Sequence, residues 1–259
     1  MADGFLTLQR EGPVAAIVLN RPEKRNAISK EMWEEMAGQL TVLEEDRTVK
    51  VIVIRSQEEQ SFSAGADIGQ FSSVRESSES AKAYDRTAYQ FLRRLGSVPK
   101  PTIAMIRGYC MGAGLELSLM CDFRMADRSA IFAITPAKLG MVYHFSGVQA
   151  LVHQVGSAYA KDLLFSARRV DAEEAYRIGL IERLVEPEAL EKEVYTYAGT
   201  LANRSPVSIR GVKRIVEKIK CGLTEADEEC ERLVSASLDG PDYKAGIEAF
   251  LHKKTPVFE

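Results

Sequence analysis

Two hydrophobic patterns alternate along the chain, one typical of buried strands and one typical of amphipathic helices. Three short apolar runs near the start predict strands: 5–10, 14–20 and 49–55. Between the second and third runs, five large apolar residues recur at helical spacing: Met32, Trp33, Met36, Leu40 and Leu43. Ser29 precedes them and is a residue type that favours the N-cap of a helix. The first 60 residues therefore predict strand, strand, helix, strand.

The same alternation continues to about residue 200. Further apolar runs predict strands at 101–106, 121–126 and 181–185, and helical spacing predicts helices at 81–95, 147–164, 171–178 and 187–203. From Pro206 onward the pattern is only helical, with polar breaks at Cys221-Gly222 and Asp239-Gly240-Pro241. The pattern favours an α/β layered core over 1–200. The helical region 201–259 is too short to hold a core alone, so we expect it to dock on the main body or on another subunit.

Two loops rich in small residues each follow a predicted strand, at 61–67 and at 108–114. In the second loop, small residues at 112–114 leave backbone N–H groups uncovered, just before Leu117–Met120, which predicts the start of a helix. The carboxylate of Glu116 follows within one turn. This arrangement suits an enzyme that stabilises an oxyanion and moves a proton beside it.

A purely structural role would also account for the small residues in these two loops. Close packing of a helix on a strand requires small residues at the contact. Neither loop fits a dinucleotide-binding fingerprint or a Walker loop. The segment 72–80 is rich in Ser and Glu, and we expect it to be mobile.

Composition narrows the function classes. The hydrophobic content of 46%, charged content of 27% and net charge of −3 are ordinary for a globular protein and indicate no bulk attraction to nucleic acid or membranes. The four cysteines form no C-x-x-C pair, so buried free thiols are expected rather than a redox or metal site. No segment has the pattern of a signal peptide or a bilayer span, and a cytoplasmic location is expected by default.

Several motifs in order along the chain resemble those of the enoyl-CoA hydratase/isomerase family, the crotonase superfamily. They are Asn20-Arg21-Pro22-x-x-Arg25-Asn26-Ala27, Phe62-Ser63-Ala64-Gly65-Ala66-Asp67-Ile68, Gly108-Tyr109-x-x-Gly112-Ala113-Gly114-x-Glu116-Leu117, Cys121-Asp122, Thr135-Pro136-Ala137-Lys138-Leu139-Gly140 and Gly246-Ile247-Glu248-Ala249-Phe250-Leu251. The resemblance covers essentially the whole chain. It implies an α/β fold, the crotonase (ClpP/crotonase-like) spiral of ββα units, with a C-terminal helical trimerisation region.

The resemblance also implies a substrate and a site. The substrate would be an acyl-CoA thioester, and the backbone amides of Ala66 and Ala113 would form the oxyanion hole. The coenzyme A end would be bound by six residues: Lys24, Arg25, Ala27, Ala64, Asp67 and Ile68. Asp67 is expected to fix its loop through backbone hydrogen bonds, and Lys24 and Arg25 could instead be part of a solvated surface loop. No metal or redox cofactor is implied, and the chain is expected to form a homotrimer or a dimer of trimers.

One departure from the family pattern bears on the reaction. Hydration in this family resembles a two-carboxylate reaction, and Glu116 matches one of the two acids. The place of the second acid, counted from Phe132 and back from Gly140, is held by Pro136. Proline can neither accept nor donate a proton, which argues against simple hydration by two glutamates.

The residues after Pro136 resemble a different branch, the methylmalonyl-CoA decarboxylases, which have Thr-Pro at this place and a tyrosine shortly after Leu-Gly. In that reaction the leaving carboxylate would be oriented by Tyr143, and Glu116 would donate a proton or order the site. A buried structural tyrosine is the alternative for Tyr143. A loop or surface histidine is expected for His144, with a catalytic role as its alternative. Position 66 is expected to be histidine in that branch and is alanine here.

The sequence leaves the reaction open between decarboxylation of a malonyl-type thioester and hydration or dehydration of an enoyl thioester. Isomerisation or C–C hydrolysis with a single Glu is a third possibility. A different class is a non-catalytic acyl-CoA- or RNA-binding relative. The net charge of −3 disfavours RNA binding.

Overall fold

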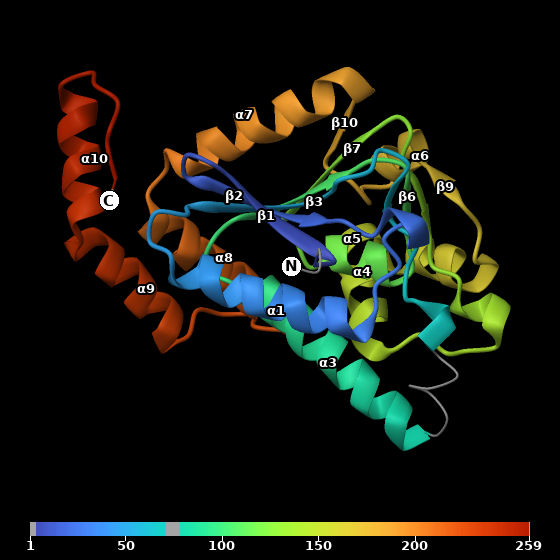
Figure 1. The fold of residues 1–259 in the computed structure, drawn as a ribbon. Coiled ribbons are helices and arrows are strands. Elements are labelled where there is room, and N and C mark those ends of the chain that lie inside the picture. The colour runs from blue at the N-terminus through green and yellow to red at the C-terminus, as the bar shows by residue number, and fades with distance from the viewer. Residues whose placement is uncertain (1–3, 71–77, 259) are drawn as a thin grey trace.

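A computed structural model describes residues 4–70 and 78–258 of the chain (Figure 1). Its larger sheet has six strands in the order β1 (Leu6–Glu11), β2 (Val14–Leu19), β3 (Val51–Ser56), β5 (Thr102–Ile106), β7 (Phe123–Asp127) and β10 (Arg183–Val185). Only the edge strand β1 pairs antiparallel among these described strands, and its neighbours from β2 to β10 are parallel. Parallel neighbours require crossover connections, which the helices supply.

A smaller sheet has four short strands in the order β4 (Ser61–Ser63), β6 (Tyr109–Met111), β8 (Ile131–Ala133) and β9 (Val170–Asp171). Successive strands go to alternate sheets, because β3, β5 and β7 join the larger sheet while β4, β6 and β8 join the smaller one. A helix follows each pair: α3 (Ser78–Ser97), α4 (Ala113–Leu119) and α5 (Phe145–Ser166). The chain therefore repeats a ββα unit. The two segments that the sequence predicted as loops each contain a strand of three residues, too short for an alternation pattern.

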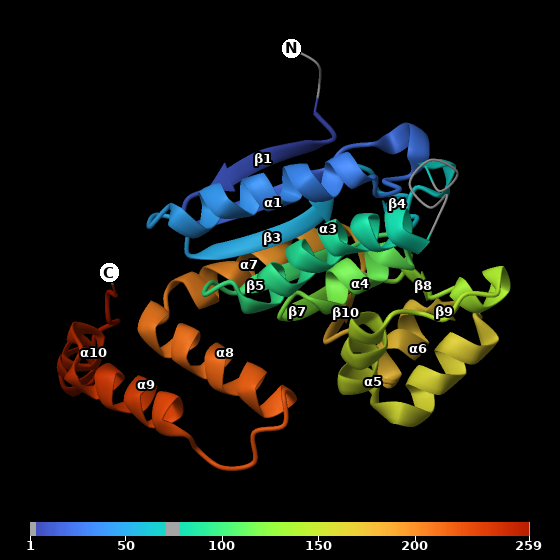
Figure 2. The same cartoon turned by 90° about the horizontal axis from the view of Figure 1, so that it is seen from below.

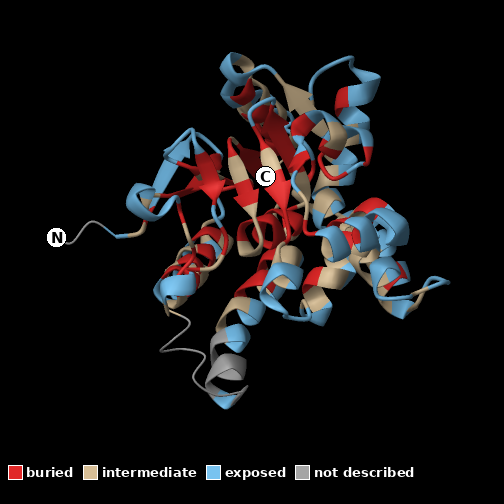
Figure 3. Cartoon of the chain, turned by 90° about the vertical axis from the view of Figure 1, so that its right-hand side faces the viewer, coloured by how far each residue is buried: buried red, intermediate tan, exposed pale blue. Residues whose placement is uncertain are grey.

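Helices cover both faces of the larger sheet (Figure 1). On one face α7 (Leu190–Ala202) packs on alternate strand residues such as Val14, Ala16 and Val18. The intervening residues Ile17 and Leu19 face the other core, together with α1 (Lys30–Glu45) and α3. Strands buried on both faces must be apolar throughout, which explains the continuous apolar runs in the sequence. Figure 3 shows the buried residues concentrated in these inner layers.

The predicted start of the first helix is confirmed in detail. The Ser29 hydroxyl accepts a hydrogen bond from Met32 N at 3.3 Å and so caps α1. All five predicted core residues of this helix are buried. The helix after the second glycine-rich loop differs from the prediction, because α4 begins at Ala113 rather than at Leu117. Its first residues are small and were therefore assigned to the loop.

The C-terminal segment forms α8 (Pro206–Lys220), α9 (Glu228–Asp239) and α10 (Pro241–Leu251), separated at the two predicted breaks. In Figure 2 these helices extend from the end of the molecule opposite α5 and α6 (Ala172–Arg177). Of the segment 72–80, residues 72–77 lie outside the described residues and 78–80 begin α3. No helix within 4–70 and 78–258 is long and apolar enough to cross a membrane.

The cysteines follow the prediction with one exception. All four are free, and Cys110, Cys121 and Cys230 are buried. Burial raises the pKa of the Cys121 thiol to about 12, so this group is an inert thiol at neutral pH. Cys221 is exposed, contrary to expectation, because it follows the last residue of α8 at the surface.

Candidate active site

Glu116 lies on α4, a helix of seven residues that is buried along most of its length. Glu116 is only 3% exposed. The helix sits directly on β4, since a Cβ added to Gly114 would lie 2.5 Å from Ser63 Cβ. A residue larger than glycine at 114 would push α4 away from the sheet and move Glu116 with it.

The loops that carry Ala66 and Ala113 touch through their backbones. A Cβ on Gly65 would lie 3.2 Å from Met111 O and 3.8 Å from Ala113 N. Gly65 has φ +105° and Gly112 has φ +47°, conformations that glycine adopts without steric cost. Within residues 4–70 and 78–258, neither Ala66 N–H nor Ala113 N–H donates a hydrogen bond to a protein acceptor. Two unpaired amide donors therefore lie in loops that are in contact.

Three side chains from residues 143–146, where α5 begins, surround the Glu116 carboxylate. Tyr143 Oη donates to Glu116 Oε2 at 3.2 Å, and His144 Nε2 lies 2.6 Å from Glu116 Oε1. Ser146 Oγ is 3.5 Å from Oε1, at the limit of a hydrogen bond. A buried carboxylate is costly unless hydrogen-bond donors surround it, and these groups supply them.

Tyr143 is packed as well as hydrogen-bonded. A Cβ on Gly147 would lie 2.4 Å from Tyr143 Cε1, so the ring rests on the bare backbone of α5. Burial, followed by the charge and hydrogen bond of Glu116, raises the pKa of Tyr143 well above its ordinary value. Tyr143 therefore remains a neutral donor to Glu116, and its burial and its hydrogen bond are compatible with both the structural and the functional role.

His144 contacts the site more closely than the sequence predicted. It is the N-cap residue of α5, and its side chain is 48% exposed although Nε2 contacts the buried Glu116. Its ring also meets that of Tyr143 edge to face, with the centroids 4.5 Å apart. The sequence signal available was a Tyr-His pair directly before a helix, in a chain with three histidines. Hydropathy does not distinguish such a histidine from a surface one.

The residues expected to bind coenzyme A lie in two loop segments that hydrogen-bond to each other through their backbones. Ala64 N donates to Arg25 O at 2.9 Å, and Ile28 N donates to Gly65 O at 2.7 Å. Lys24 and Arg25 are exposed. Ile28 and Ala66 also form a parallel β-bridge. This bridge places Ala27, which precedes Ile28, and Ile68, two residues after Ala66, in the same region. The structure thus brings all six predicted residues into one region.

Asp67 stabilises this region through a backbone hydrogen bond, the kind of contact predicted for it, and through an ion pair that was not predicted. Its Oδ1 accepts from Gly69 N at 3.1 Å, and its Oδ2 pairs with Arg21 Nη1 at 2.8 Å. Arg21 also donates to Ala27 O at 2.9 Å. Arg21 and the fully buried Asn26 belong to a motif quoted from the sequence, but their contacts were not predicted. The Asn26 amide donates to Ser56 Oγ at 2.7 Å and to Ser61 O at 3.0 Å. Their partners lie far away in sequence, so no local pattern reveals them.

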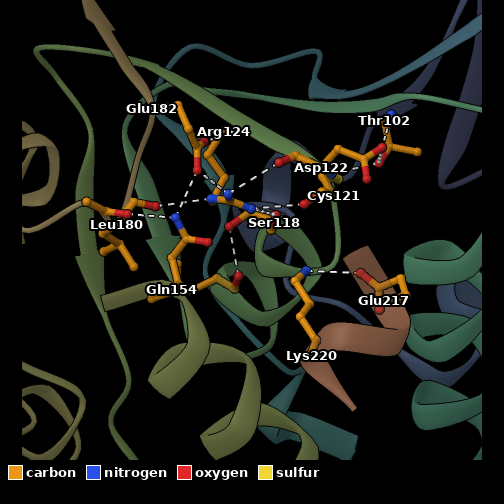
Figure 4. Close-up of polar contacts among 12 residues, drawn as sticks. Thr102, Ser118, Cys121, Asp122, Arg124, Gln154, Leu180, Glu182, Glu217 and Lys220 are labelled. Atoms are coloured by element: carbon orange, nitrogen blue, oxygen red, sulfur yellow. Dashed lines mark hydrogen bonds and ion pairs between the residues drawn. The ribbon is translucent and has the colours of Figure 1, made fainter. Parts of the chain in front are cut away.

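The C-terminal end of α4 is held by Arg124, which is 2% exposed (Figure 4). Its Nη1 donates to Ser118 O at 3.2 Å and to Cys121 O at 2.9 Å, and Nε donates to Leu180 O at 3.1 Å. A cation at a helix C-terminus satisfies the last carbonyls and complements the helix dipole. Glu182 pairs with the same guanidinium. Arg124 thereby ties the helix that carries Glu116 to β7 and β10.

Pro136 begins the 3-10 helix η3 (Pro136–Leu139), with Thr135 before it. A proline at the first helical position is well suited to this turn, because its missing N–H would have no helical partner. The turn holds no acidic side chain. The segment after it instead delivers Tyr143 and His144 to Glu116.

Comparison with known proteins supports the expected fold and family. The family model described as enoyl-CoA hydratase/isomerase matches residues 9–259. The crotonyl-CoA hydratase of Syntrophomonas wolfei is 32% identical over 100% of this chain and 99% of its own length. The short-chain-enoyl-CoA hydratase of Clostridium acetobutylicum is 30% identical, over 95% of this chain and 94% of its own length. A crystal structure of an enoyl-CoA hydratase/carnithine racemase from Magnetospirillum magneticum superposes with a TM-score of 0.95 at 33% identity, covering 100% of this chain and 96% of that one. These similarities confirm the predicted fold class.

Proposed function

The chain belongs to the enoyl-CoA hydratase/isomerase family, and from that premise we propose that it is an acyl-CoA lyase. In this proposal the amides of Ala66 and Ala113 hold the oxygen of a thioester enolate, and Glu116 moves a proton at the adjacent carbon. The observation that carries the proposal is the position of Glu116, a buried carboxylate three residues beyond Ala113 on the same short helix. Gly65 holds the loop of Ala66 against that helix start.

Two backbone donors suit an enolate for a physical reason. They are fixed before the reaction and need no reorganisation as charge develops on the thioester oxygen. Removing one such donor typically costs about 3–4 kcal/mol in transition-state stabilisation. Because the donors are main-chain groups, the side chains of Ala66 and Ala113 contribute little, and only a change such as proline would remove an N–H.

Hydration of an enoyl-CoA, or the reverse dehydration, is the first candidate reaction. It is supported by the two relatives described above, whose names are crotonyl-CoA hydratase and short-chain-enoyl-CoA hydratase. Because Pro136 stands in place of a second acid, the proton must be transferred by Glu116 together with its hydrogen-bond partners Tyr143 and His144.

Decarboxylation of a malonyl-type thioester is the second candidate. Pro136 favours it, because no second protein acid is needed when the substrate supplies the carboxylate that leaves as CO₂. Tyr143, which lies beside Glu116, would orient that carboxylate. The electron pair of the broken C–C bond forms the enolate. A proton donor such as Glu116 then protonates the enolate at the α-carbon. A site without a second acid avoids repulsion of the substrate's own carboxylate.

The exposed Lys24 and Arg25 would meet the phosphates of coenzyme A in this proposal, and Ala27, Ala64 and Ile68 would line the adenine and ribose end. Lysine and arginine side chains are the usual partners of phosphate groups. We also propose assembly into trimers through the C-terminal helices. Exposed apolar residues on those helices support it: Val212, Val216, Ile219, Val234, Leu238, Ile247, Phe250 and Leu251. Sedimentation analysis of the purified chain tests this assembly.

A paired substrate assay tests the function. Crotonyl-CoA and methylmalonyl-CoA are given separately to the purified chain, with product mass and released CO₂ as readouts. Addition of water to crotonyl-CoA supports hydration, and CO₂ from methylmalonyl-CoA supports decarboxylation. Glu116→Gln should lower turnover in either case while binding of the CoA ester stays the same. Binding of both esters without turnover would contradict the proposal and favour a non-catalytic acyl-CoA-binding protein.

A further inference from the structure

We propose that His144 is a positioning and proton-relay residue that connects the buried carboxyl of Glu116 to solvent. The inference rests on the proposed function, because it assigns a path to the proton that Glu116 exchanges with the substrate. His144 contacts Glu116 at hydrogen-bond distance in the structure, although the sequence favoured a surface role for it.

His144 connects the buried Glu116 carboxyl to solvent. Glu116 is 3% exposed, so its carboxyl cannot readily exchange protons with bulk water. The side chain of His144 is 48% exposed, and its Nε2 lies 2.6 Å from Glu116 Oε1. An imidazole carries two ring nitrogens and can accept a proton at one while releasing a proton at the other. His144 therefore spans the boundary between the buried acid and solvent.

The neighbouring groups are less suited to a relay. Tyr143 donates to the other oxygen, Oε2, at 3.2 Å, and its raised pKa keeps the phenol protonated. Tyr143 therefore orients the carboxyl without passing its proton on. Ser146 Oγ is 3.5 Å from Oε1, too long for efficient transfer. Glu116 from α4 and Tyr143 from the segment before α5 both face the imidazole.

The proton balance of the relay closes without a further reactant. When the neutral Glu116 carboxyl protonates the enolate, a C–H bond forms and the carboxylate remains. His144 then transfers the proton on Nε2 to Glu116 Oε1, and solvent returns a proton to the ring at Nδ1. Removal of a proton from the substrate runs through the same steps in reverse. Proton delivery leaves the ring as its Nδ1–H tautomer, and proton removal restores the Nε2–H tautomer. A round of removal and return, as in hydrogen exchange, therefore leaves the imidazole in its starting state.

The relay also accounts for the missing second acid. Pro136 stands at the place where the family resemblance implies a carboxylate, and it cannot transfer protons. A half-exposed imidazole further along the same segment supplies a titratable group to the Glu116 carboxyl. General acid–base groups of this kind typically contribute about 10²–10⁴-fold to a rate.

The test is exchange of the α-hydrogens of butyryl-CoA for deuterium in D₂O, measured by mass spectrometry with and without added imidazole. His144→Ala removes the ring and leaves space for free imidazole. His144→Gln keeps an N–H that can bond to Glu116 but cannot relay a proton. His153→Ala, at an exposed site on α5, is the matched control.

We expect exchange to fall roughly 10²-fold in both His144 variants. Imidazole should restore it in His144→Ala in proportion to concentration, but not in His144→Gln. The control should match the wild type. Wild-type exchange in His144→Gln would overturn the relay, as would failure of imidazole to rescue a folded His144→Ala. If His144→Ala does not fold, His144→Gln alone decides. Absence of exchange by the wild type would overturn the proposed function itself, and the relay with it.

Discussion

The ring of Tyr143 lies over Gly147, where a Cβ would approach Tyr143 Cε1 to 2.4 Å. This contact fixes the tyrosine on the first turn of α5, with its hydroxyl 3.2 Å from Glu116 Oε2. The absent side chain at 147 is thus a condition for the hydrogen bond at the candidate catalytic carboxyl.

Gly147→Ala should displace the tyrosine ring and break its hydrogen bond to Glu116. A hydrogen bond to a charged group is worth about 1.5–3 kcal/mol, so turnover should fall at least about tenfold. Gly199→Ala on α7 is the control, because no atom lies within 4 Å of its added Cβ. The control should keep full activity and gain about 0.5–1 kcal/mol in unfolding free energy. Equal activity of the two variants would contradict the role given to the Tyr143 contact.

Tyr143 should make the stability of the protein sensitive to alkaline pH. The pKa of Tyr143 in the folded chain is raised by burial and by Glu116, whereas in the unfolded chain its pKa is about 10. Above that pH the unfolded chain has lost the proton that the folded chain keeps, so unfolding becomes more favourable as pH rises. Denaturant unfolding between neutral pH and about pH 11 should show this decline.

Tyr143→Phe removes the titrating group and should flatten that alkaline decline. The same variant should slow decarboxylation specifically if the tyrosine orients a leaving carboxylate. A decline as steep as that of the wild type would show that other groups cause it.

Arg124→Met should destabilise the protein and lower activity together. The change leaves the carbonyls at the end of α4 without their donor and Glu182 without its partner. Loss of these bonds should cost at least about 2 kcal/mol in unfolding free energy. Arg128→Met is the control, since this exposed arginine pairs with Glu173 and Glu186 at the surface and each such pair is worth roughly 0–1 kcal/mol. Thermal denaturation of the two variants gives the comparison.

The positive charges at 24 and 25 should act on binding rather than on chemistry. Arg25 has φ +50°, so Arg25→Asn keeps a residue that tolerates this backbone while removing the charge. Combined with Lys24→Ala, it should raise KM several-fold, with kcat nearly unchanged and with a weaker dependence on salt. Lys192→Ala, at an exposed position on α7, should change neither constant. A fall in kcat alone would contradict a phosphate-binding role.

Much of the fold follows from local pattern. The cap at Ser29 and the buried face of α1 were predicted residue by residue, because a helix repeats its apolar positions over many turns. The smaller sheet was not predicted, since strands as short as β4 and β6 carry no readable period. The start of α4 at Ala113 was missed for a related reason, because small residues resemble a loop.

The candidate site divides in the same way. Glu116, Ala66 and Ala113 were singled out from motifs, and the structure places their loops in contact. The contacts of His144 with Glu116 and of Arg21 with Asp67 join side chains that are 28 positions and 46 positions apart along the chain. Such contacts depend on how the ββα units stack, which no local pattern contains.

A crystal structure with bound butyryl-CoA tests the central claim most directly. The account predicts the thioester oxygen about 2.7–3.1 Å from both Ala66 N and Ala113 N, with the Glu116 carboxyl facing the α-carbon. A thioester oxygen bound by neither amide, or an acyl group held away from Glu116, would contradict it.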